Sequence, residues 1–167
     1  MSRSAKPFKY LIDPDHESFL NPGNMPEAIK TFCRDTGQPA PKEKPAISRC
    51  IYDSLVLKYK HTIRQIEDIT GNKIEKLHII GGGAKNQMLN QLTADALGIP
   101  VFAGPVEATA IGNIMMQAKA LGIVNDLAHI REIVRNSFEV VKYYPKPEPA
   151  WEKAFIRFEK LIQTVKD

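Results

Sequence analysis

The sequence predicts an α/β fold in which helices dominate and the sheet is small. Long segments carry apolar residues at helical spacing, whereas only two or three short apolar runs have the composition and the glycine or proline boundaries of strands. In the middle of the chain strands and helices alternate, an order that predicts parallel strands joined by a crossover helix. A sheet this small is expected to form part of a larger one.

The first half of the chain predicts an irregular start followed by two helices. Residues 1–23 are rich in proline, aspartate and glycine and lack helical or strand periodicity. A short helix is expected over 25–36, ending at Gly37, and a long helix over 45–70, ending at Gly71. The apolar side of the short helix carries Met25, Ile29, Phe32 and Cys33. The long helix carries two adjacent apolar stripes, formed by Ile47, Ile51 and Leu55 and by Val56, Tyr59, Ile63 and Ile66.

The second half predicts the strands and four more helices. Strands are expected at 76–82 and 100–105, with a strand or extended arm at 138–145. Helices are expected at 86–97, 107–122 and 125–137, the last of them capped by Asn125 or Asp126, and then near the C-terminus. A proline-rich link over 143–149 leads to the last helix. The apolar side of that helix carries Trp151, Phe155, Phe158, Ile162 and Val165.

Composition excludes several classes of function. The 23 lysine and arginine residues are scattered among 19 acidic residues, so the net charge of +4 indicates a solvated surface and no nucleic-acid partner. No apolar run approaches the roughly 20 residues that span a bilayer, and no secretory leader is visible, so no membrane partner is expected. Two cysteines fit a reducing compartment, and we expect a cytoplasmic protein.

The two cysteines leave two alternatives open. Cys33 and Cys50 each lie on an apolar helical face, which favours buried free thiols. They lie on consecutive helices, however, and a bridge between them is also compatible with the sequence. The four histidines have no spacing typical of metal ligands.

A glycine-rich loop in the stretch KLHIIGGGAKNQ is the main candidate site. It is not a P-loop, because Asn86 follows Lys85 where that motif requires serine or threonine. It is not a dinucleotide fingerprint either, because Asn86 stands where that motif requires its third glycine. Gly81, Gly82 and Gly83 would nevertheless let a flat ring or a phosphate approach the backbone.

Asn86 is the polar candidate of this loop. Its amide offers both a donor and an acceptor. Asn86 stands where the next helix begins, and the positive dipole end of that helix points toward the loop. The alternative is that the glycines only allow tight packing and that Asn86 caps the helix. The second strand is followed by five small residues that would allow close packing of the next helix: Ala103, Gly104, Ala108, Ala110 and Gly112.

Three segments resemble the FGGY family of carbohydrate kinases. They are LHIIGGGAKNQMLNQLTADALGIPVFAGPVEATAIGN, IDPDHESFLNPGNM and SRCIYDSLVLKYK, and the resemblance extends from about Leu11 to the last helix. The family's glycine pair and asparagine match Gly82, Gly83 and Asn86 in one register and Gly81, Gly82 and Asn86 in another, and the second register is preferred because Gly82 and Asn86 then match the family's adenosine-binding positions. The resemblance implies that Gly82 and Asn86 bind adenosine, while Gly81 and Gly83 shape the turn. Paired cysteines of the family resemble Cys33 and Cys50, which also supports the bridge.

The resemblance further implies an actin-like, ribonuclease H-like ATPase fold of two domains. Residues 1–167 would form the C-terminal part of the second domain. The segments are most similar to family members that transfer the γ-phosphoryl group of ATP to the 1-hydroxyl of L-rhamnulose with Mg2+. The D-x-G-T phosphate turns are absent from the chain, because DITGN only imitates them. Asp13, Asp15 and Asp95 match the catalytic base by residue type alone.

We therefore expect a kinase segment that carries the adenosine half of an ATP site. This chain alone is expected to be inactive, with the catalytic aspartate and most Mg2+ ligands upstream of it. Two alternatives stay open: a non-catalytic nucleotide-binding or interaction fragment that self-associates through exposed apolar surface, and a kinase of the same family with another sugar substrate.

Overall fold

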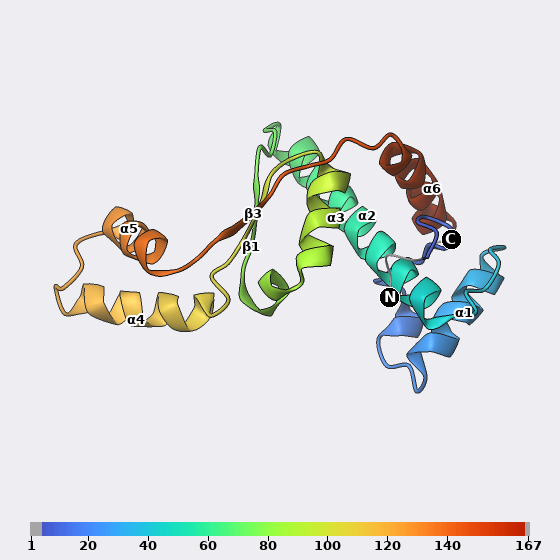
Figure 1. Cartoon of the computed structure of the whole chain (residues 1–167), viewed down its shortest axis with the longest axis horizontal. Helices are drawn as coiled ribbons and strands as arrows, with labels where there is room; N and C mark the ends of the chain where they lie inside the picture. The colour runs from blue at the N-terminus through green and yellow to red at the C-terminus, as the bar shows by residue number, and fades with distance from the viewer. Residues whose placement is uncertain (1–4, 166–167) are drawn as a thin grey trace. The chain divides into compact units, whose positions relative to one another are not determined.

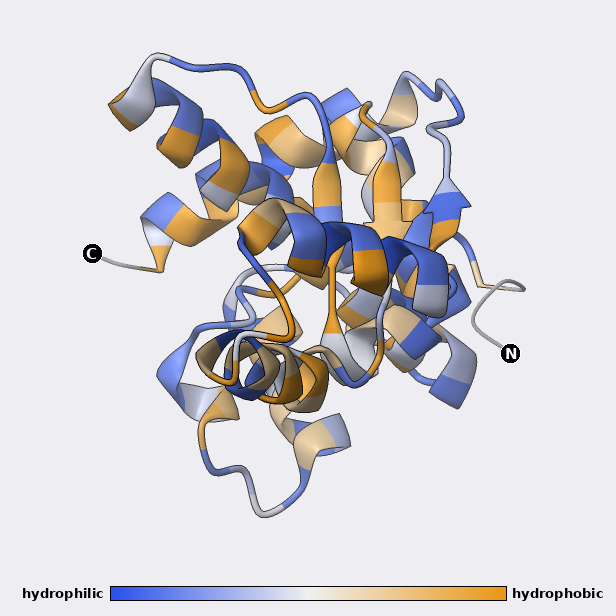
Figure 2. Ribbon diagram, turned by 90° about the vertical axis from the view of Figure 1, so that its left-hand side faces the viewer, coloured by the Kyte–Doolittle hydropathy of each residue, from blue (hydrophilic) through white to orange (hydrophobic). Residues whose placement is uncertain are grey.

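A computed structural model describes residues 5–165 of the chain (Figure 1). The chain divides into two compact units. The first combines Met1–Lys73 with Pro147–Asp167, and the second is Ile74–Lys146. In Figure 2, hydrophilic and hydrophobic residues alternate along the helical ribbons, as amphipathic helices require.

The first unit is helical. It contains a short 3-10 helix, η2 (Glu17–Phe19), and three α-helices, α1 (Met25–Asp35), α2 (Lys44–Thr70) and α6 (Ala150–Thr164). The start of α1 is capped by the side chain of Asn24, which accepts a hydrogen bond from the N–H of Glu27. Gly71 ends α2 in the left-handed conformation, at a φ of 68°, as the sequence predicts.

Aromatic residues of α6 and apolar residues of α1 and α2 form the core of the first unit. The predicted stripe of α6 is confirmed for its buried members, Trp151, Phe155, Phe158 and Ile162. Cys33 and Cys50 lie in this core as free thiols, and contact with Cys33 together with burial raises the pKa of Cys50. The stripes predicted for α1 and α2 were wrong for Met25, Tyr59 and Ile66, whose side chains are exposed.

The segment that precedes η2 is held by polar contacts to the helices of the first unit. Phe8 has a left-handed backbone, at a φ of 57°, which is uncommon for a bulky residue. Its N–H donates to the Asp53 carboxylate in α2 at 2.7 Å, and its carbonyl accepts from Arg157 in α6. The Phe8 ring packs edge-on against Trp151, with 4.6 Å between the centroids. These contacts hold the irregular segment without regular structure of its own.

The second unit contains a three-stranded sheet and three α-helices. The elements in chain order are β1 (Leu77–Ile79), η3 (Gly81–Lys85), α3 (Gln87–Leu97), β2 (Val101–Ala103), α4 (Ala108–Ala120), α5 (Leu127–Ser137) and β3 (Val141–Tyr143). The order of strands is β1-β2-β3, with β1 and β2 parallel and β2 and β3 antiparallel. The parallel pair joined by α3 confirms the predicted alternation, although each strand is shorter than expected.

The two faces of the sheet differ. Val101 and Ala103 in the central strand are buried, and α3 packs against this strand. On the other face, the register places His78 beside Phe102 and Phe102 beside Lys142. The His78 and Phe102 rings stack with centroids 5.1 Å apart. This face is therefore polar and aromatic, whereas the face toward α3 is apolar.

No helix among residues 5–165 is long and apolar enough to cross a membrane.

Candidate functional site

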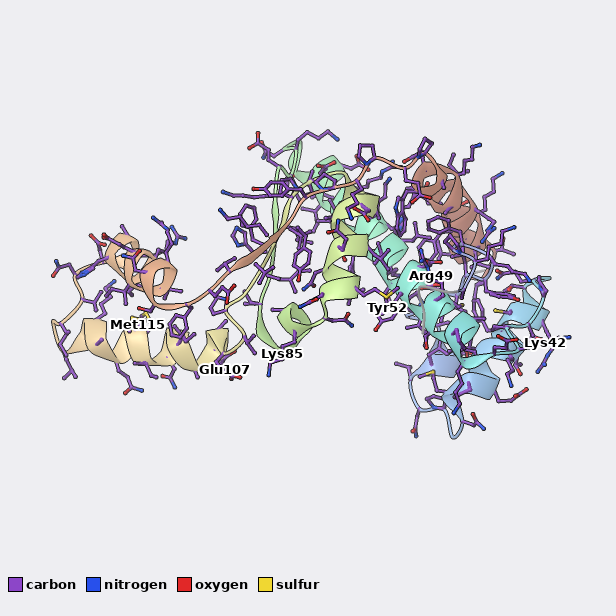
Figure 3. The ribbon with its side chains drawn as sticks, viewed as in Figure 1. Lys42, Arg49, Tyr52, Lys85, Glu107 and Met115 are labelled. Carbon is purple, nitrogen blue, oxygen red and sulfur yellow. The ribbon has the colours of Figure 1, made fainter. Side chains whose placement is uncertain are left out.

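Two loops meet at the carboxyl ends of the parallel strands. The first follows β1 and contains η3, and the second follows β2 and leads to α4. The N–H of Gly81 donates to the carbonyl of Pro105 at 3.2 Å, and the N–H of Gly104 donates to the carbonyl of Ile79 at 2.8 Å. Figure 3 shows Lys85 at the end of the first loop and Glu107 at the end of the second. This edge of a parallel sheet is where α/β proteins commonly bind ligands.

The three glycines of the first loop differ in whether backbone conformation or packing requires a residue without a side chain. Gly81 has a φ of 73°, which a residue with a side chain rarely adopts. A Cβ on Gly83 would make an ordinary contact with Ile79, at 3.5 Å. At Gly82 φ is not positive, and apart from its chain neighbours and the backbone of η3 no described atom lies within 4 Å of the place where a Cβ would stand. The fold of this unit therefore accounts for Gly81 but not for Gly82.

Asn86 caps α3, as one of the two readings of the sequence predicts. Its Oδ1 atom accepts a hydrogen bond from the N–H of Leu89 at 3.1 Å. The capping role is confirmed, because a carboxamide oxygen at this position satisfies one of the helix's first N–H groups. Contact of the Asn86 amide with a nucleotide stays a prediction.

Asn90 is a buried polar residue beside the candidate site that the sequence pattern did not single out. It lies one helical turn after Asn86, is fully buried, and donates from Nδ2 to the carbonyl of Ala84 in η3 at 2.9 Å. The signal was available in the sequence, because residues four apart on a helix share a face. An asparagine four positions after the capping residue is therefore placed toward the loop that precedes the helix.

The small residues of the second loop are only partly explained by packing. Gly104 has a φ of 125°, and a Cβ there would stand 2.8 Å from the carbonyl oxygen of Glu139, so the prediction of close approach is confirmed. Ala103 is buried in β2. For Ala110 and Gly112 the prediction was wrong, because both lie on the exposed side of α4.

The aspartates that match a catalytic base by type have structural partners. Lys58 contacts Asp13 at 3.0 Å and Asp15 at 2.9 Å. The Asp95 carboxylate accepts hydrogen bonds from the Gln91 side chain and from the N–H of Lys146, both at 2.8 Å. Within the described part of the chain, no three histidine, cysteine, aspartate or glutamate side chains are grouped in a way that could hold a metal ion.

Comparison with protein families settles the relationship of the chain. Residues 1–121 match the C-terminal domain of the FGGY family of carbohydrate kinases. The chain belongs to this family. The match contains both loops at the sheet edge and the residues Gly81, Gly82, Gly83 and Asn86.

Curated relatives agree with the family assignment. The chain is 45% identical over 160 residues to a rhamnulokinase of Bacteroides thetaiotaomicron, covering 96% of this chain and 33% of that protein. It is 43% identical over 156 residues to a rhamnulokinase of Pectobacterium atrosepticum, covering 93% of this chain and 32% of that protein. A rhamnulokinase of Bacillus subtilis is 45% identical over 145 residues, which cover 87% of this chain and 30% of that protein. The chain thus spans about a third of the length of these relatives.

Solved structures confirm the fold class. The crystal structure of ligand-bound xylulose kinase from Lactobacillus acidophilus matches 74% of this FGGY chain and 25% of its own chain, with a TM-score of 0.60 at 17% identity. The xylulose kinase from Rhodospirillum rubrum matches 75% of this chain and 25% of its own, with a TM-score of 0.59 at 21% identity. The chain therefore shares the α/β fold of the matching part of these sugar kinases, which is rich in helices and has a small sheet.

Proposed function

We propose that this FGGY chain supplies the adenosine-binding part of the ATP site of a kinase that phosphorylates L-rhamnulose at its 1-hydroxyl. The observation that carries the proposal is Gly82. Neither its backbone conformation nor a neighbouring atom requires a glycine there, and the residue lies at the sheet edge where α/β proteins bind ligands. Because glycine has no side chain, the backbone at Gly82 leaves room for a flat base to approach.

Asn86 and the start of α3 supply the polar part of the proposed site. The N-terminus of a helix carries partial positive charge and favours electron-rich ligands. The Oδ1 atom of Asn86 accepts from the first turn of α3, and the Asn86 side-chain amide is the polar group that we assign to the base or the ribose. The proposed set is therefore Gly82 and Asn86 as contacts, with Gly81 and Gly83 shaping the turn.

Phosphoryl transfer itself is assigned to the rest of such a kinase. The reaction requires a base near the sugar hydroxyl and metal-bridged phosphates. Asp13, Asp15 and Asp95 are engaged in contacts within the chain, and the described residues do not fit a Mg2+ site. We assign no residue of this chain to Mg2+ and propose that the chain by itself does not transfer phosphate. A kinase that uses cellular ATP is proposed to act in the cytoplasm.

The sugar is proposed from the relatives. Three rhamnulokinases share 43–45% identity with the chain, whereas the xylulose kinases share its fold at 17% and 21% identity. We therefore favour L-rhamnulose over the alternative that the chain belongs to a kinase for another sugar.

A chimaera tests the proposal. In it, this chain replaces the matching third of the Bacteroides rhamnulokinase, to which it is 45% identical. The Michaelis constants for ATP and for L-rhamnulose are measured in the chimaera and in its Asn86→Ser and Asn86→Ala variants. Serine keeps a capping oxygen but lacks the amide donor, whereas alanine lacks both, and alanine is expected to lower the free energy of unfolding by about 1 kcal/mol.

The proposal expects both variants to raise the Michaelis constant for ATP and to leave that for L-rhamnulose unchanged. If serine restores both stability and ATP affinity, Asn86 acts only as a cap. Equal effects on both substrates, or a folded chimaera without kinase activity, would contradict the proposed adenosine site. Activity on D-xylulose in place of L-rhamnulose would contradict the assignment of the sugar.

Self-association is a second proposal, favoured by exposed apolar residues of the second unit. Ile114 and Met116 in α4 are 59% and 58% exposed, and Leu121 and Ile123, which follow α4, are 76% and 68% exposed. Apolar surface of this kind favours association. In sedimentation equilibrium, the chain is expected to form dimers or larger species that Ile114→Glu dissociates. Ile156→Glu, at an exposed isoleucine of α6, is the matched control. A monomeric wild-type chain would contradict this proposal.

A further inference from the structure

Asn90 connects α3 to the glycine loop. Its backbone is helical, because its N–H donates to the carbonyl of Asn86 at 3.0 Å. Its side chain reaches back past the start of the helix, and Nδ2 donates to the carbonyl of Ala84 at 2.9 Å. Asn90 is fully buried and Ala84 is 9% exposed, so this hydrogen bond is shielded from water. It joins the last part of η3 to helix α3.

The other half of the Asn90 amide has no partner. Within residues 5–165, no donor reaches Oδ1 of Asn90. A buried acceptor without a hydrogen bond destabilises the folded state. A leucine of similar size would remove the unpaired oxygen but would leave the Ala84 carbonyl without its donor. These two effects oppose each other, so the stability of the unit alone does not call for an amide here, and its explanation lies in what the bond to Ala84 holds.

The hydrogen bond from Asn90 holds the Ala84 peptide, which lies close to Gly82 in the loop. Ala84 lies two residues after Gly82 and two before Asn86, between the two residues to which we assign the nucleotide contacts. Fixing its carbonyl fixes the orientation of the surrounding peptide planes in η3. A loop held in its binding conformation before the ligand arrives loses less entropy on binding.

We propose that Asn90 is a positioning residue that holds the glycine loop in the conformation that binds the nucleotide. This inference rests on the proposed adenosine site and adds to it a residue that the ligand does not touch. Asn90 acts through Ala84, and its contribution is to loop order and not to contact.

Hydrogen exchange of the 167-residue chain tests the inference without a nucleotide. In Asn90→Leu, the amides of residues 82–86 are expected to exchange about five- to tenfold faster, the equivalent of one lost buried hydrogen bond. The matched control is Thr93→Val. Thr93 is equally buried in α3, but its hydroxyl donates to Leu89 within the helix, at 2.7 Å, and not to the loop. Unchanged exchange of the loop in Asn90→Leu would overturn the inference.

Kinetics of the chimaera supply the second measurement. Asn90→Leu is expected to raise the Michaelis constant for ATP about threefold to tenfold while the free energy of unfolding stays within about 1 kcal/mol of wild type. Thr93→Val is expected to leave the Michaelis constant unchanged. Asn90→Ala replaces the leucine variant if leucine does not fit. A fall in stability without a change in the Michaelis constant would reduce Asn90 to a structural residue and overturn the inference.

Gly82→Ala separates this inference from the proposed function. If Gly82→Ala weakens ATP binding and Asn90→Leu does not, the adenosine site stands and the positioning role fails. If neither variant affects ATP while loop exchange rises in Asn90→Leu, the loop is not the nucleotide site, and both proposals fail together.

Discussion

The N–H of Gly81 donates a hydrogen bond to the carbonyl of Pro105 at 3.2 Å, and this bond joins the loops that follow the two parallel strands. A second bond runs in the opposite direction, because the N–H of Gly104 donates to the carbonyl of Ile79 at 2.8 Å. The backbone of Gly81 is therefore fixed by the loop after β2, and that of Gly104 by the last residue of β1, so the two loops share one hydrogen-bonded frame. Gly82 is the next residue along this frame and is where we place the base of the nucleotide.

Substitution of Gly81 by alanine is expected to destabilise the chain. The residue has a φ of 73°, and a left-handed conformation costs an ordinary residue about 1–2 kcal/mol. Urea unfolding of Gly81→Ala is predicted to show a loss of that size. Gly112→Ala is the control, because Gly112 lies in α4 with no described atom within 4 Å of a Cβ, where alanine favours the helix. Equal stability of Gly81→Ala and wild type would contradict the account of the turn.

Asp53 is expected to be a strong determinant of stability in the first unit. Its carboxylate is 1% exposed and accepts hydrogen bonds from Phe8 and from Arg49, each at 2.7 Å. Burial raises its pKa, while both partners oppose that shift. Asp53→Ala leaves Arg49 without its carboxylate and releases Phe8, and we expect a loss of about 3 kcal/mol in the free energy of unfolding.

Glu27→Ala is the control for Asp53→Ala. Glu27 pairs with Lys30 and Arg34 on the exposed side of α1, and its removal is expected to cost much less stability than that of Asp53, because solvent screens exposed ion pairs. Similar losses in the two variants would show that burial of Asp53 does not govern its contribution.

The pair of cations around Glu152 predicts a pH-dependent contribution to stability. Hydrogen bonds from Lys60 at 2.8 Å and from Arg64 at 2.9 Å connect α2 to α6 and lower the pKa of Glu152 below its usual value of 4.5. A carboxyl whose pKa is lowered on folding stabilises the folded state above its unfolded-state pKa. That stabilisation is lost as the pH falls through the lower pKa of the folded state.

Glu152→Gln measures this contribution. At neutral pH the variant is expected to be less stable than wild type by no more than about 1 kcal/mol, because the Glu152 side chain is half exposed. The difference between the two proteins is expected to shrink as the pH falls below 4.5, the usual value for glutamate. A difference that stays constant from neutral to acid pH would show that the ion pairs do not stabilise the fold.

The sequence predicted those helices whose ends carry a capping residue or a terminal glycine. Gly71 and Gly98 end α2 and α3 in the left-handed conformation that glycine favours, at φ values of 68° and 72°. Asp126 caps α5 through a 2.8 Å hydrogen bond to the N–H of His129. Such signals act within a few residues of the chain and can be read directly. The parallel pairing of β1 and β2 followed from the alternation of strands and helices.

Features that depend on distant neighbours were not predictable from the sequence. The exposure of Ala110 and Gly112 depends on what covers α4, which a pattern of small residues does not specify. The 3-10 conformation of the glycine loop, Gly81–Lys85, depends on its hydrogen bond to the loop after β2. The difference between Gly81 and Gly82 also needs coordinates, since three consecutive glycines look alike in a sequence.

The most direct test of the account is the Michaelis constant for ATP in the chimaera carrying Gly82→Ala. Beyond its chain neighbours and the backbone of η3, no described atom lies within 4 Å of the added methyl group, so the free energy of unfolding is expected to stay at the wild-type value. The methyl group would occupy the space that we assign to the adenine, and the Michaelis constant for ATP is predicted to rise about tenfold or more, with that for L-rhamnulose unchanged. A stable Gly82→Ala chimaera with an unchanged Michaelis constant for ATP would contradict the assignment of this loop to adenosine.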